Sequence, residues 1–238
     1  MEWKTSEWKG YTRYDFEVNG HACLLIVPDL PARGKPWVWR AEFFDAFAYA
    51  DMALLEKGWH IAYCDLHDRF GSPGAVAEMK VFHDTLGKVF GLAEKADLFG
   101  FSRGGLYAAN YTAAYPEDVA VLYLDAPVQD LRSWPLGAGE GTGSPADVEL
   151  CKKEFGVSDI RNIEYMPVNQ IDKLNAGGVP VLLVYGDADE VVPYSENGRM
   201  LAEAFTGEIE IIPKPGVGHH PHSLEESAPI VEFICRHH

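Results

Sequence analysis

The sequence predicts an α/β fold with a mostly parallel, doubly wound sheet and helices on both of its faces. Short apolar runs of the kind found in strands buried on both faces recur along the chain. Segments with helical spacing of apolar residues lie between them, as in sheets built from crossover units. The 238 residues, 47% apolar and 24% charged, are ordinary for one globular domain, so we expect a single domain over residues 1–238.

The expected strands begin with an edge strand at residues 11–18, where polar and apolar side chains alternate. The run Ala-Cys-Leu-Leu-Ile-Val-Pro at residues 22–28 is continuously apolar, which favours a strand in the interior of the sheet. Further strands are expected at residues 59–64, 97–101, 119–125, 179–185 and 208–212.

Helices are expected between these strands. Residues 41–57 carry apolar side chains at helical spacing and stop at Gly58, a typical residue just beyond a helix end. Ser72 and Pro73 are typical of a helix start, with serine as N-cap and proline at the first helical position. That helix should end near Gly91, and others are expected at residues 104–115, 196–205 and 229–235.

Residues 128–176 interrupt the alternation of strands and helices. The segment is rich in glycine at its start and then contains short helical pieces. We expect it to form a small cap or lid above the sheet, the alternative being a long surface connection.

Charge and cysteine usage exclude several classes of protein. The formal net charge of −16 repels phosphate groups, so nucleic acid is not an expected partner. No apolar run approaches the ~20 residues of a membrane helix. No cysteine lies in a Cys-x-x-Cys pair, and Cys23 and Cys64 fall in apolar runs, which indicates buried thiols rather than a disulfide framework or a zinc motif.

The segment Gly100-Phe101-Ser102-Arg103-Gly104 has the Gly-x-Ser-x-Gly spacing of a sharp strand-to-helix turn that exposes a serine. Small residues are needed on either side because the chain crowds itself there, and an apolar strand and an alanine-rich helix flank the turn as required. Ser102 is the candidate nucleophile, and the backbone N–H of Arg103 is a candidate donor to an oxyanion. The sequence leaves open whether the Arg103 side chain forms a salt bridge or contacts a substrate.

A serine nucleophile requires a histidine base that is oriented by a carboxylate. In folds that carry such a turn, these residues occur along the chain in the order serine, acid, histidine. Asp187, Asp189 and Glu190 follow the expected strand 179–185. Asp189 is favoured by its resemblance to the Gly-x-x-Asp…Val-Pro pattern usual in such folds. Asp187 is the alternative, with turn formation as its other role.

The candidate base lies among His219, His220 and His222, which follow the expected strand 208–212. His219 comes directly after Gly218, the usual placement for the base. We expect His220 and His222 to pack against or order the loop. A metal site is not expected, because no acidic or thiolate residues flank the histidines at metal-ligand spacing.

On these residues the sequence resembles the α/β-hydrolase superfamily over nearly its whole length. The Ser-Arg-Gly-Gly turn at residues 102–105 is similar to that of prolyl-oligopeptidase-like and dienelactone-hydrolase-like esterases. The Gly-His-His-Pro-His-Ser-Leu segment at residues 218–224 resembles bacterial hydrolases often found near carbohydrate-processing genes. The resemblance implies ester hydrolysis with no cofactor and does not identify a substrate. Our leading hypothesis is hydrolysis of small or carbohydrate-linked acyl esters through an acyl-enzyme. We expect a soluble protein, and the sequence leaves its compartment open between a bacterial cytoplasm and the periplasm or exterior where a signal peptide has been removed.

One departure from the superfamily concerns the second oxyanion donor. Many members carry a His-Gly pair after the third strand, whereas here that strand ends Pro28-Asp29-Leu30-Pro31. We expect the backbone N–H of Trp37 to act instead, with Leu30 as the alternative. Pocket-lining roles are expected for Trp39, Arg40 and Glu42, although both tryptophans also fit a place in the core.

Two other functions stay open. A peptidase would use the same three residues, but such enzymes usually carry an extra domain that selects peptides, for which 238 residues leave no room. A non-catalytic binding protein on the same scaffold is disfavoured by the intact set of serine, acid and histidine.

Overall fold

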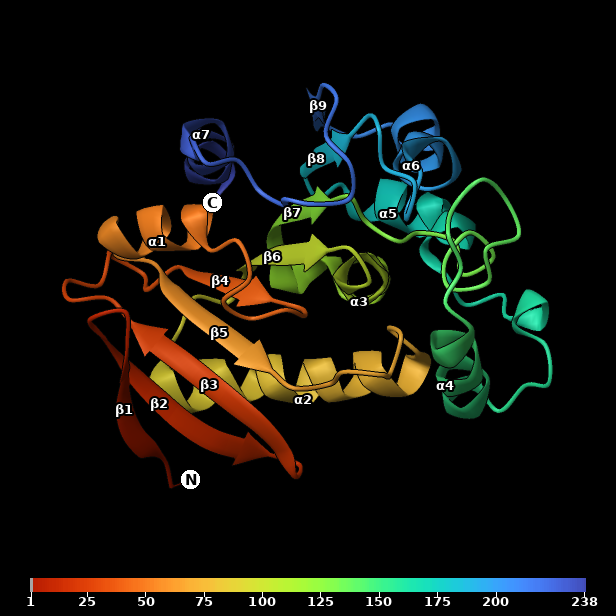
Figure 1. Ribbon diagram of the computed structural model, residues 1–238. Coiled ribbons are helices and arrows are strands. Elements are labelled where there is room, and N and C mark those ends of the chain that lie inside the picture. Colours follow the sequence, from red (N-terminus) through yellow and green to blue (C-terminus); the bar gives the residue numbers. More distant parts are fainter. Residues whose placement is uncertain (1) are drawn as a thin grey trace.

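The computed structural model describes residues 2–238 and is built on a nine-stranded sheet with the order β1-β2-β3-β5-β4-β6-β7-β8-β9 (Figure 1). From β5 to β9 every neighbouring pair is parallel, whereas β1, β2 and β3 form an antiparallel extension that joins β5. The predicted, mostly parallel α/β fold is confirmed. The strands are Lys4–Trp8 (β1), Tyr11–Val18 (β2), His21–Val27 (β3), Trp37–Arg40 (β4), His60–Cys64 (β5), Ala96–Phe101 (β6), Val119–Asp125 (β7), Val181–Gly186 (β8) and Ile209–Lys214 (β9).

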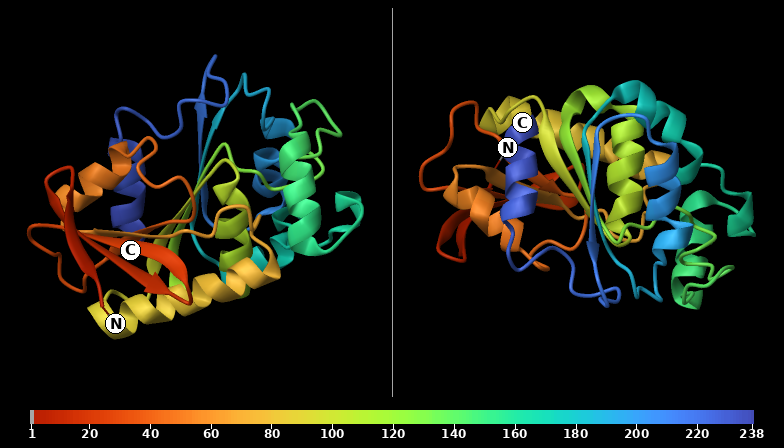
Figure 2. Two further views of the ribbon diagram at one scale, coloured as in Figure 1. Left: turned by 60° about the horizontal axis from the view of Figure 1, so that its bottom comes forward. Right: turned by 90° about the horizontal axis from the view of Figure 1, so that it is seen from above.

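Helices cover both faces of the sheet, and each face has its own apolar core (Figure 2). On one face, side chains of α2, α3 and α5 pack against the sheet; on the other, α1 and α7 do so. The helices are Tyr49–Glu56 (α1), Pro73–Phe90 (α2), Gly104–Ala114 (α3), Pro145–Phe155 (α4), Ile171–Gly177 (α5), Gly198–Ala204 (α6) and Ala228–His237 (α7).

The start and end of α2 follow the sequence signals. The Ser72 hydroxyl accepts a hydrogen bond from the Ala75 N–H at 3.1 Å, and Pro73 occupies the first helical position. Gly91 ends the helix in the left-handed conformation, with φ of 66°. Both ends are therefore fixed locally.

The predicted helix at residues 41–57 is wrong over its first half, because α1 begins only at Tyr49. Residues 37–40 form β4, a short strand that the sequence analysis missed, and a loop connects β4 to α1. Within that loop Phe43, Asp45 and Phe47 have φ of 53°, 73° and 51°. These values lie in the left-handed region and prevent a right-handed helix.

Arg40 fixes the path of this loop. Its guanidinium donates to the carbonyl oxygens of Phe43 and Ala46, both at 2.9 Å, and pairs with Asp51 on α1 at 3.1 Å. Only 1% of Arg40 is exposed, and its guanidinium lies over the Phe101 ring at 4.0 Å. The buried charge is thus paired and hydrogen-bonded, which is the condition under which burial of a charge is tolerated.

The segment 128–176, predicted to form a cap, contains α4, α5 and two short 3₁₀ helices, Ile160–Asn162 and Pro167–Asn169. Its helix α4 lies beside the turn that follows β6, because Asp147 pairs with Arg103 at 3.2 Å. The function of this segment as a lid stays a prediction.

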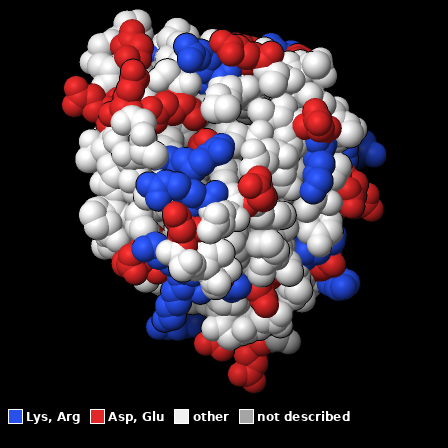
Figure 3. Space-filling model, turned by 90° about the vertical axis from the view of Figure 1, so that its right-hand side faces the viewer, with Lys and Arg blue, Asp and Glu red and all other residues white. Residues whose placement is uncertain are grey.

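The surface that carries α4 and α6 shows Lys and Arg side chains beside Asp and Glu (Figure 3). Each of these two helices holds a local ion pair. On α4, Lys152 pairs with Glu149 at 2.7 Å, and on α6, Arg199 pairs with Glu203 at 3.8 Å. Within residues 2–238, none of the helices combines the length and the apolar character needed to cross a bilayer.

Glycine is required where the chain turns from β6 into α3. A β-carbon on Gly105 would lie 2.5 Å from Pro127 Cβ and 2.9 Å from Pro127 Cα. A β-carbon on Gly100 would lie 2.9 Å from the Gly104 carbonyl oxygen. The turn can therefore close only with hydrogen atoms at these positions.

We expect Gly105→Ala to lower the free energy of unfolding by about 1–3 kcal/mol, because the new methyl group overpacks a backbone contact. Gly87→Ala, at an exposed helical position with no atom within 4 Å of the new carbon, is the matched control and should stabilise by a few tenths of a kcal/mol to about 1 kcal/mol. Urea unfolding of both variants measures the difference. Equal stabilities would contradict this account of the turn.

Candidate active site

Ser102 lies at the carboxyl end of β6, in a strained turn. Its φ of 47° is unusual for a residue with a side chain. Two hydrogen bonds tie its backbone to β7 and to the loop after it. Its N–H donates to the Asp125 carbonyl oxygen at 3.0 Å, and its own carbonyl oxygen accepts from the Val128 N–H at 2.9 Å. These contacts compensate a conformational cost of about 1–3 kcal/mol and aim the hydroxyl away from the sheet.

The three predicted residues of the site are brought together. Ser102 Oγ lies 2.8 Å from His219 Nε2, and His219 Nδ1 lies 2.7 Å from Asp189 Oδ2. Asp189 follows β8 and His219 follows β9, so the carboxyl ends of three parallel strands supply the set. This is the edge at which ligands bind in open α/β sheets.

Asp189 is held in place by the loop that follows it. Its Oδ1 accepts hydrogen bonds from the N–H groups of Val191 and Val192, both at 2.9 Å. Burial raises the pKa of the Asp189 carboxyl, but the hydrogen bonds from His219 and from the Val192 backbone lower it, and the net shift is downward. A carboxylate oriented in this way fixes the tautomer of the histidine, with the proton on Nδ1.

The alternative acid Asp187 has a different place in the structure. Its Oδ1 accepts a hydrogen bond of 2.6 Å from the Gly216 N–H, so it links the loops after β8 and β9. Asp187 thus has the turn-forming role considered for it in the sequence.

The prediction of Trp37 as the second oxyanion donor is wrong. Trp37 begins β4, at the opposite end of the strand from the site; it is fully buried, and its indole donates to the Ala93 carbonyl oxygen at 3.0 Å. Val38 pairs with Asp97 in register, which places Trp37 about six residues, or roughly 20 Å, below Ser102. The alternative, Leu30, lies in the connection that precedes β4 and is 84% exposed.

The predicted donor is wrong because the prediction treats the strand at residues 22–28 as the strand that leads to the oxyanion donor. The strand at residues 22–28 belongs to the antiparallel extension, and β4 is the strand beside β6. The segment that lies against the turn therefore starts at Ala41, whose N–H donates to the Phe99 carbonyl oxygen at 3.0 Å. The next N–H, of Glu42, lies 3.6 Å from the point where a Gly104 β-carbon would be.

The residues expected to line a pocket have mainly structural contacts. Trp39 packs in the core against Trp37 and Tyr111, with ring centroids 5.5 and 4.8 Å apart. Arg40 orders the loop after β4, as described above. Of the three, Glu42 is the one that lines a cavity, and its carboxylate is occupied by Arg103.

Arg103 and Glu42 form a bidentate pair beside the turn. Arg103 Nη2 and Nε each lie 2.8 Å from a Glu42 carboxylate oxygen, and Arg103 Nη1 also contacts Asp68 at 3.0 Å and Asp147 at 3.2 Å. Burial raises the pKa of Glu42, whereas the Arg103 hydrogen bonds lower it; the net shift is upward. The Arg103 side chain thus forms salt bridges that join the loop after β4, the loop after β5 and α4.

A second carboxylate–histidine pair lies next to the first and was not anticipated. Asp125, fully buried at the end of β7, has its Oδ1 3.0 Å from His222 Nδ1 and 3.3 Å from Lys214 Nζ. Its Oδ2 accepts from the Ser223 N–H at 2.7 Å and from the Tyr123 hydroxyl at 2.9 Å. The sequence signal was an acid at the end of an apolar strand, the same signal that pointed to Asp189. His222 orders the loop, as predicted.

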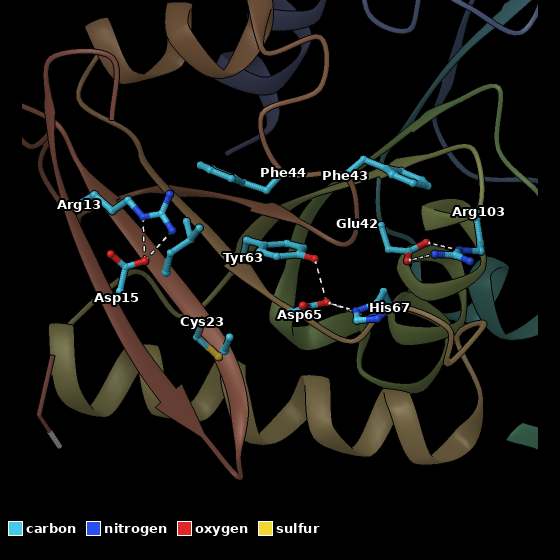
Figure 4. Close-up of a pocket in the computed structure, with 12 residues that line it drawn as sticks. Arg13, Asp15, Cys23, Glu42, Phe43, Phe44, Tyr63, Asp65, His67 and Arg103 are labelled. Carbon is cyan, nitrogen blue, oxygen red and sulfur yellow. Dashed lines mark hydrogen bonds and ion pairs between the residues drawn. The ribbon is translucent and has the colours of Figure 1, made fainter. Parts of the chain in front are cut away.

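A cavity of about 510 Å³ is lined in part by Arg103 and Glu42 (Figure 4). One wall comes from the antiparallel strands and the opposite wall from the loop after β4. Its lining combines charged side chains with aromatic rings: Arg13, Asp15, Ala22, Cys23, Leu24, Glu42, Phe43, Phe44, Tyr63, Asp65, His67 and Arg103.

Comparison with solved structures identifies the fold. The chain is 16% identical to an α/β-hydrolase enzyme from a lagoon-sediment metagenome, covering 93% of this chain and 96% of that one, with a TM-score of 0.61. It is 15% identical to an S-formylglutathione hydrolase from Agrobacterium tumefaciens, covering 100% of this chain and 97% of that one, with a TM-score of 0.63. It is 14% identical to a puromycin-hydrolysing peptidase from Mycobacterium tuberculosis (94% and 38% covered, TM-score 0.71).

These likenesses establish that the chain has the α/β-hydrolase fold. The chain spans 35% to 38% of the length of three matched structures whose names include a peptidase. No protein-family model matches the sequence, and no curated protein does so either.

We expect Arg103→Ala to destabilise the protein by about 3–5 kcal/mol, because it leaves the buried Glu42 carboxylate without its partner. Adding Glu42→Gln should recover part of that loss, since the uncompensated charge is then gone. The free energies of unfolding in urea, measured for the unchanged protein and for the single and double variants, give a double-mutant cycle. Arg161→Ala, which breaks an exposed pair with Asp159, is the control and should leave the free energy of unfolding almost unchanged, because water screens the pair. A double variant less stable than Arg103→Ala would contradict this reasoning.

Proposed function

We propose that the protein is a serine hydrolase that cleaves carboxylic esters through Ser102, His219 and Asp189. The observation that carries the proposal is the unbroken hydrogen-bonded chain from Ser102 Oγ through His219 to Asp189, with distances of 2.8 and 2.7 Å. A hydroxyl, a base and an orienting carboxylate within hydrogen-bond reach are the components of an activated nucleophile.

In the proposed reaction, His219 Nε2 takes the proton of the Ser102 hydroxyl while Oγ attacks the ester carbonyl carbon. Asp189 stabilises the imidazolium that forms. The negative charge that develops on the carbonyl oxygen is bound by the backbone N–H of Arg103 and by an N–H of the segment 42–43, which lies against the turn. His219 then gives its proton to the departing alcohol oxygen, and water releases the acyl group from Ser102 by the same steps.

The substrate class is proposed from the cavity beside Arg103. Asp65 and His67 line it as a hydrogen-bonded pair 2.6 Å apart, and Tyr63, Phe43 and Phe44 add aromatic surface. Burial raises the pKa of Asp65, but the hydrogen bonds from His67 lower it and the net shift is downward, so this wall carries a carboxylate at neutral pH. Carboxylates and rings together suit a polyhydroxylated leaving group, which supports carbohydrate-linked acyl esters.

A peptidase is the second candidate, because several matched structures are named as peptidases and the same three residues cleave amides. Short p-nitrophenyl esters and aminoacyl-naphthylamides, assayed side by side, separate the two activities. Cleavage of the naphthylamides without cleavage of the esters would replace the esterase proposal.

Ser102→Ala should lower kcat for p-nitrophenyl acetate by about 10⁵–10⁶-fold, because the nucleophile and its base act as a unit. The variant should also fail to react with a fluorophosphonate probe. Ser158→Ala, at an exposed serine, is the control and should react as the unchanged protein does. Retention of activity in Ser102→Ala would refute the proposed nucleophile.

Asp65→Asn should raise KM for acetylated sugars by about tenfold, equal to about 1.4 kcal/mol of lost interaction, with a much smaller effect on p-nitrophenyl acetate. The reason is that the proposal places the sugar in the cavity and the small leaving group outside it. Asp172→Asn, on the exposed side of α5, is the matched control. An equal change for both substrates would show that the cavity does not bind the sugar.

A further inference from the structure

Three histidine rings meet at the site, although the proposed reaction uses only one of them. The ring centroids of His219, His220 and His222 lie 4.9 Å from one another in all three pairs. One nitrogen from each ring can be chosen so that all three lie within 4.8 Å of one another. This arrangement gathers three ligands of the type preferred by divalent transition metals in one small region.

His222 supplies an independent sign that a ligand belongs there. The residue is 3% exposed, and its Nδ1 is bonded to Asp125, yet its Nε2 has no hydrogen-bond partner among residues 2–238. Because the Nδ1–H of His222 donates a hydrogen bond to the carboxylate, the proton stays on Nδ1 and Nε2 carries a free lone pair. A buried acceptor without a partner costs about 1–3 kcal/mol, which a bound cation would remove.

His219 has the same arrangement as His222. Its Nδ1 is bonded to a buried carboxylate, that of Asp189, and its Nε2 lone pair faces the Ser102 hydroxyl. Histidines that bind metal through one nitrogen commonly donate the other N–H to a carboxylate, which fixes the ring and makes the free nitrogen a better ligand. Two of the three rings are thus already oriented as metal ligands.

The third ring, His220, lies on the exposed side of the loop and stacks on Phe47 with centroids 5.6 Å apart. Nitrogen ligands at the ordinary Zn–N distance of about 2.0–2.1 Å lie about 3.4 Å from one another in a tetrahedron. The histidine rings therefore have to approach one another, and the exposed His220 has the freedom to turn. Lys214, beside Asp125, neutralises part of the local negative charge, so we expect weaker binding than at a structural zinc site.

We propose that His219, His220 and His222 bind one divalent transition-metal ion of the Zn²⁺ class and that this ion inhibits the enzyme. The metal and the Ser102 proton compete for the same lone pair on His219 Nε2, so the metal-bound ring cannot act as the base. The binding site stands on the geometry alone, whereas the inhibition rests on the proposed function.

Binding is tested in the Ser102→Ala protein, which keeps all three histidines and removes hydrolysis from the measurement. Zn²⁺ is titrated in competition with a chromophoric chelator, and Co²⁺ is added separately to read the coordination geometry from its visible spectrum. We expect one ion per chain and the intense bands of tetrahedral Co²⁺. Adding His220→Ala or His222→Gln should each weaken Zn²⁺ binding by at least tenfold.

Two controls exclude binding elsewhere. His21→Ala removes a partly exposed histidine on β3, and the double variant His237→Ala/His238→Ala removes the terminal pair. Both should bind Zn²⁺ as before. Unchanged binding in His220→Ala, at an exposed position where folding is not at stake, or loss of binding in either control, would overturn the site.

Inhibition is tested in the protein with Ser102 intact. For this protein and for each histidine variant, the turnover rate of p-nitrophenyl acetate with Zn²⁺ is divided by the rate without it. EDTA should restore the rate, and His220→Ala should shift the Zn²⁺ concentration for half-inhibition by at least tenfold. If Ser102→Ala binds Zn²⁺ but the intact protein hydrolyses neither esters nor amides, the proposed function fails and the metal site stands. If the intact protein is active and saturating Zn²⁺ leaves its rate unchanged, the inhibitory role is refuted.

Discussion

Asp125 connects the parts of the molecule on which the site depends. Its backbone carbonyl accepts a hydrogen bond from the Ser102 N–H, so it holds the turn that carries the proposed nucleophile. Its side chain accepts from His222 and from the Ser223 N–H, so it also holds the loop that carries His219. Because one fully buried residue at the end of β7 anchors both segments, the distance between Ser102 and His219 is set through a short path. Without this shared anchor, the distance between Ser102 and His219 would depend on two loops that move independently.

The parallel strands supply the rest of the alignment. β6, β8 and β9 each end at the same edge of the sheet. Their relative heights are fixed by the registers of β6 with β7, β7 with β8 and β8 with β9. Buried ion pairs then complete the surroundings: Arg40 shapes the loop after β4, and Arg103 ties that loop to α4 through Glu42 and Asp147. These charges are satisfied internally, so they order the backbone around the site without taking part in the proposed chemistry.

The sequence was sufficient where a residue's role is set by its neighbours in the chain. Ser102 was found from the glycines around it, and Asp189 and His219 from their places after apolar strands. It was insufficient for β4, because four residues ending in a charged side chain carry little periodic signal. Missing that strand assigned the oxyanion donor to Trp37, at the wrong end of the sheet. The pairing of Asp125 with His222 joins positions 97 residues apart, and no local pattern specifies such a contact.

The antiparallel extension has a consequence for how such a protein can diversify. The strands β2 and β3 supply one wall of the cavity, including Arg13 and Asp15, yet none of Ser102, Asp189 and His219 lies on them. Their exposed side chains can be exchanged, or the turn at Asn19 and Gly20 lengthened, without moving the strand ends that align the three residues. In the proposed function, recognition and chemistry are therefore carried by separable parts of the fold, so selection can change the first while the second is inherited intact.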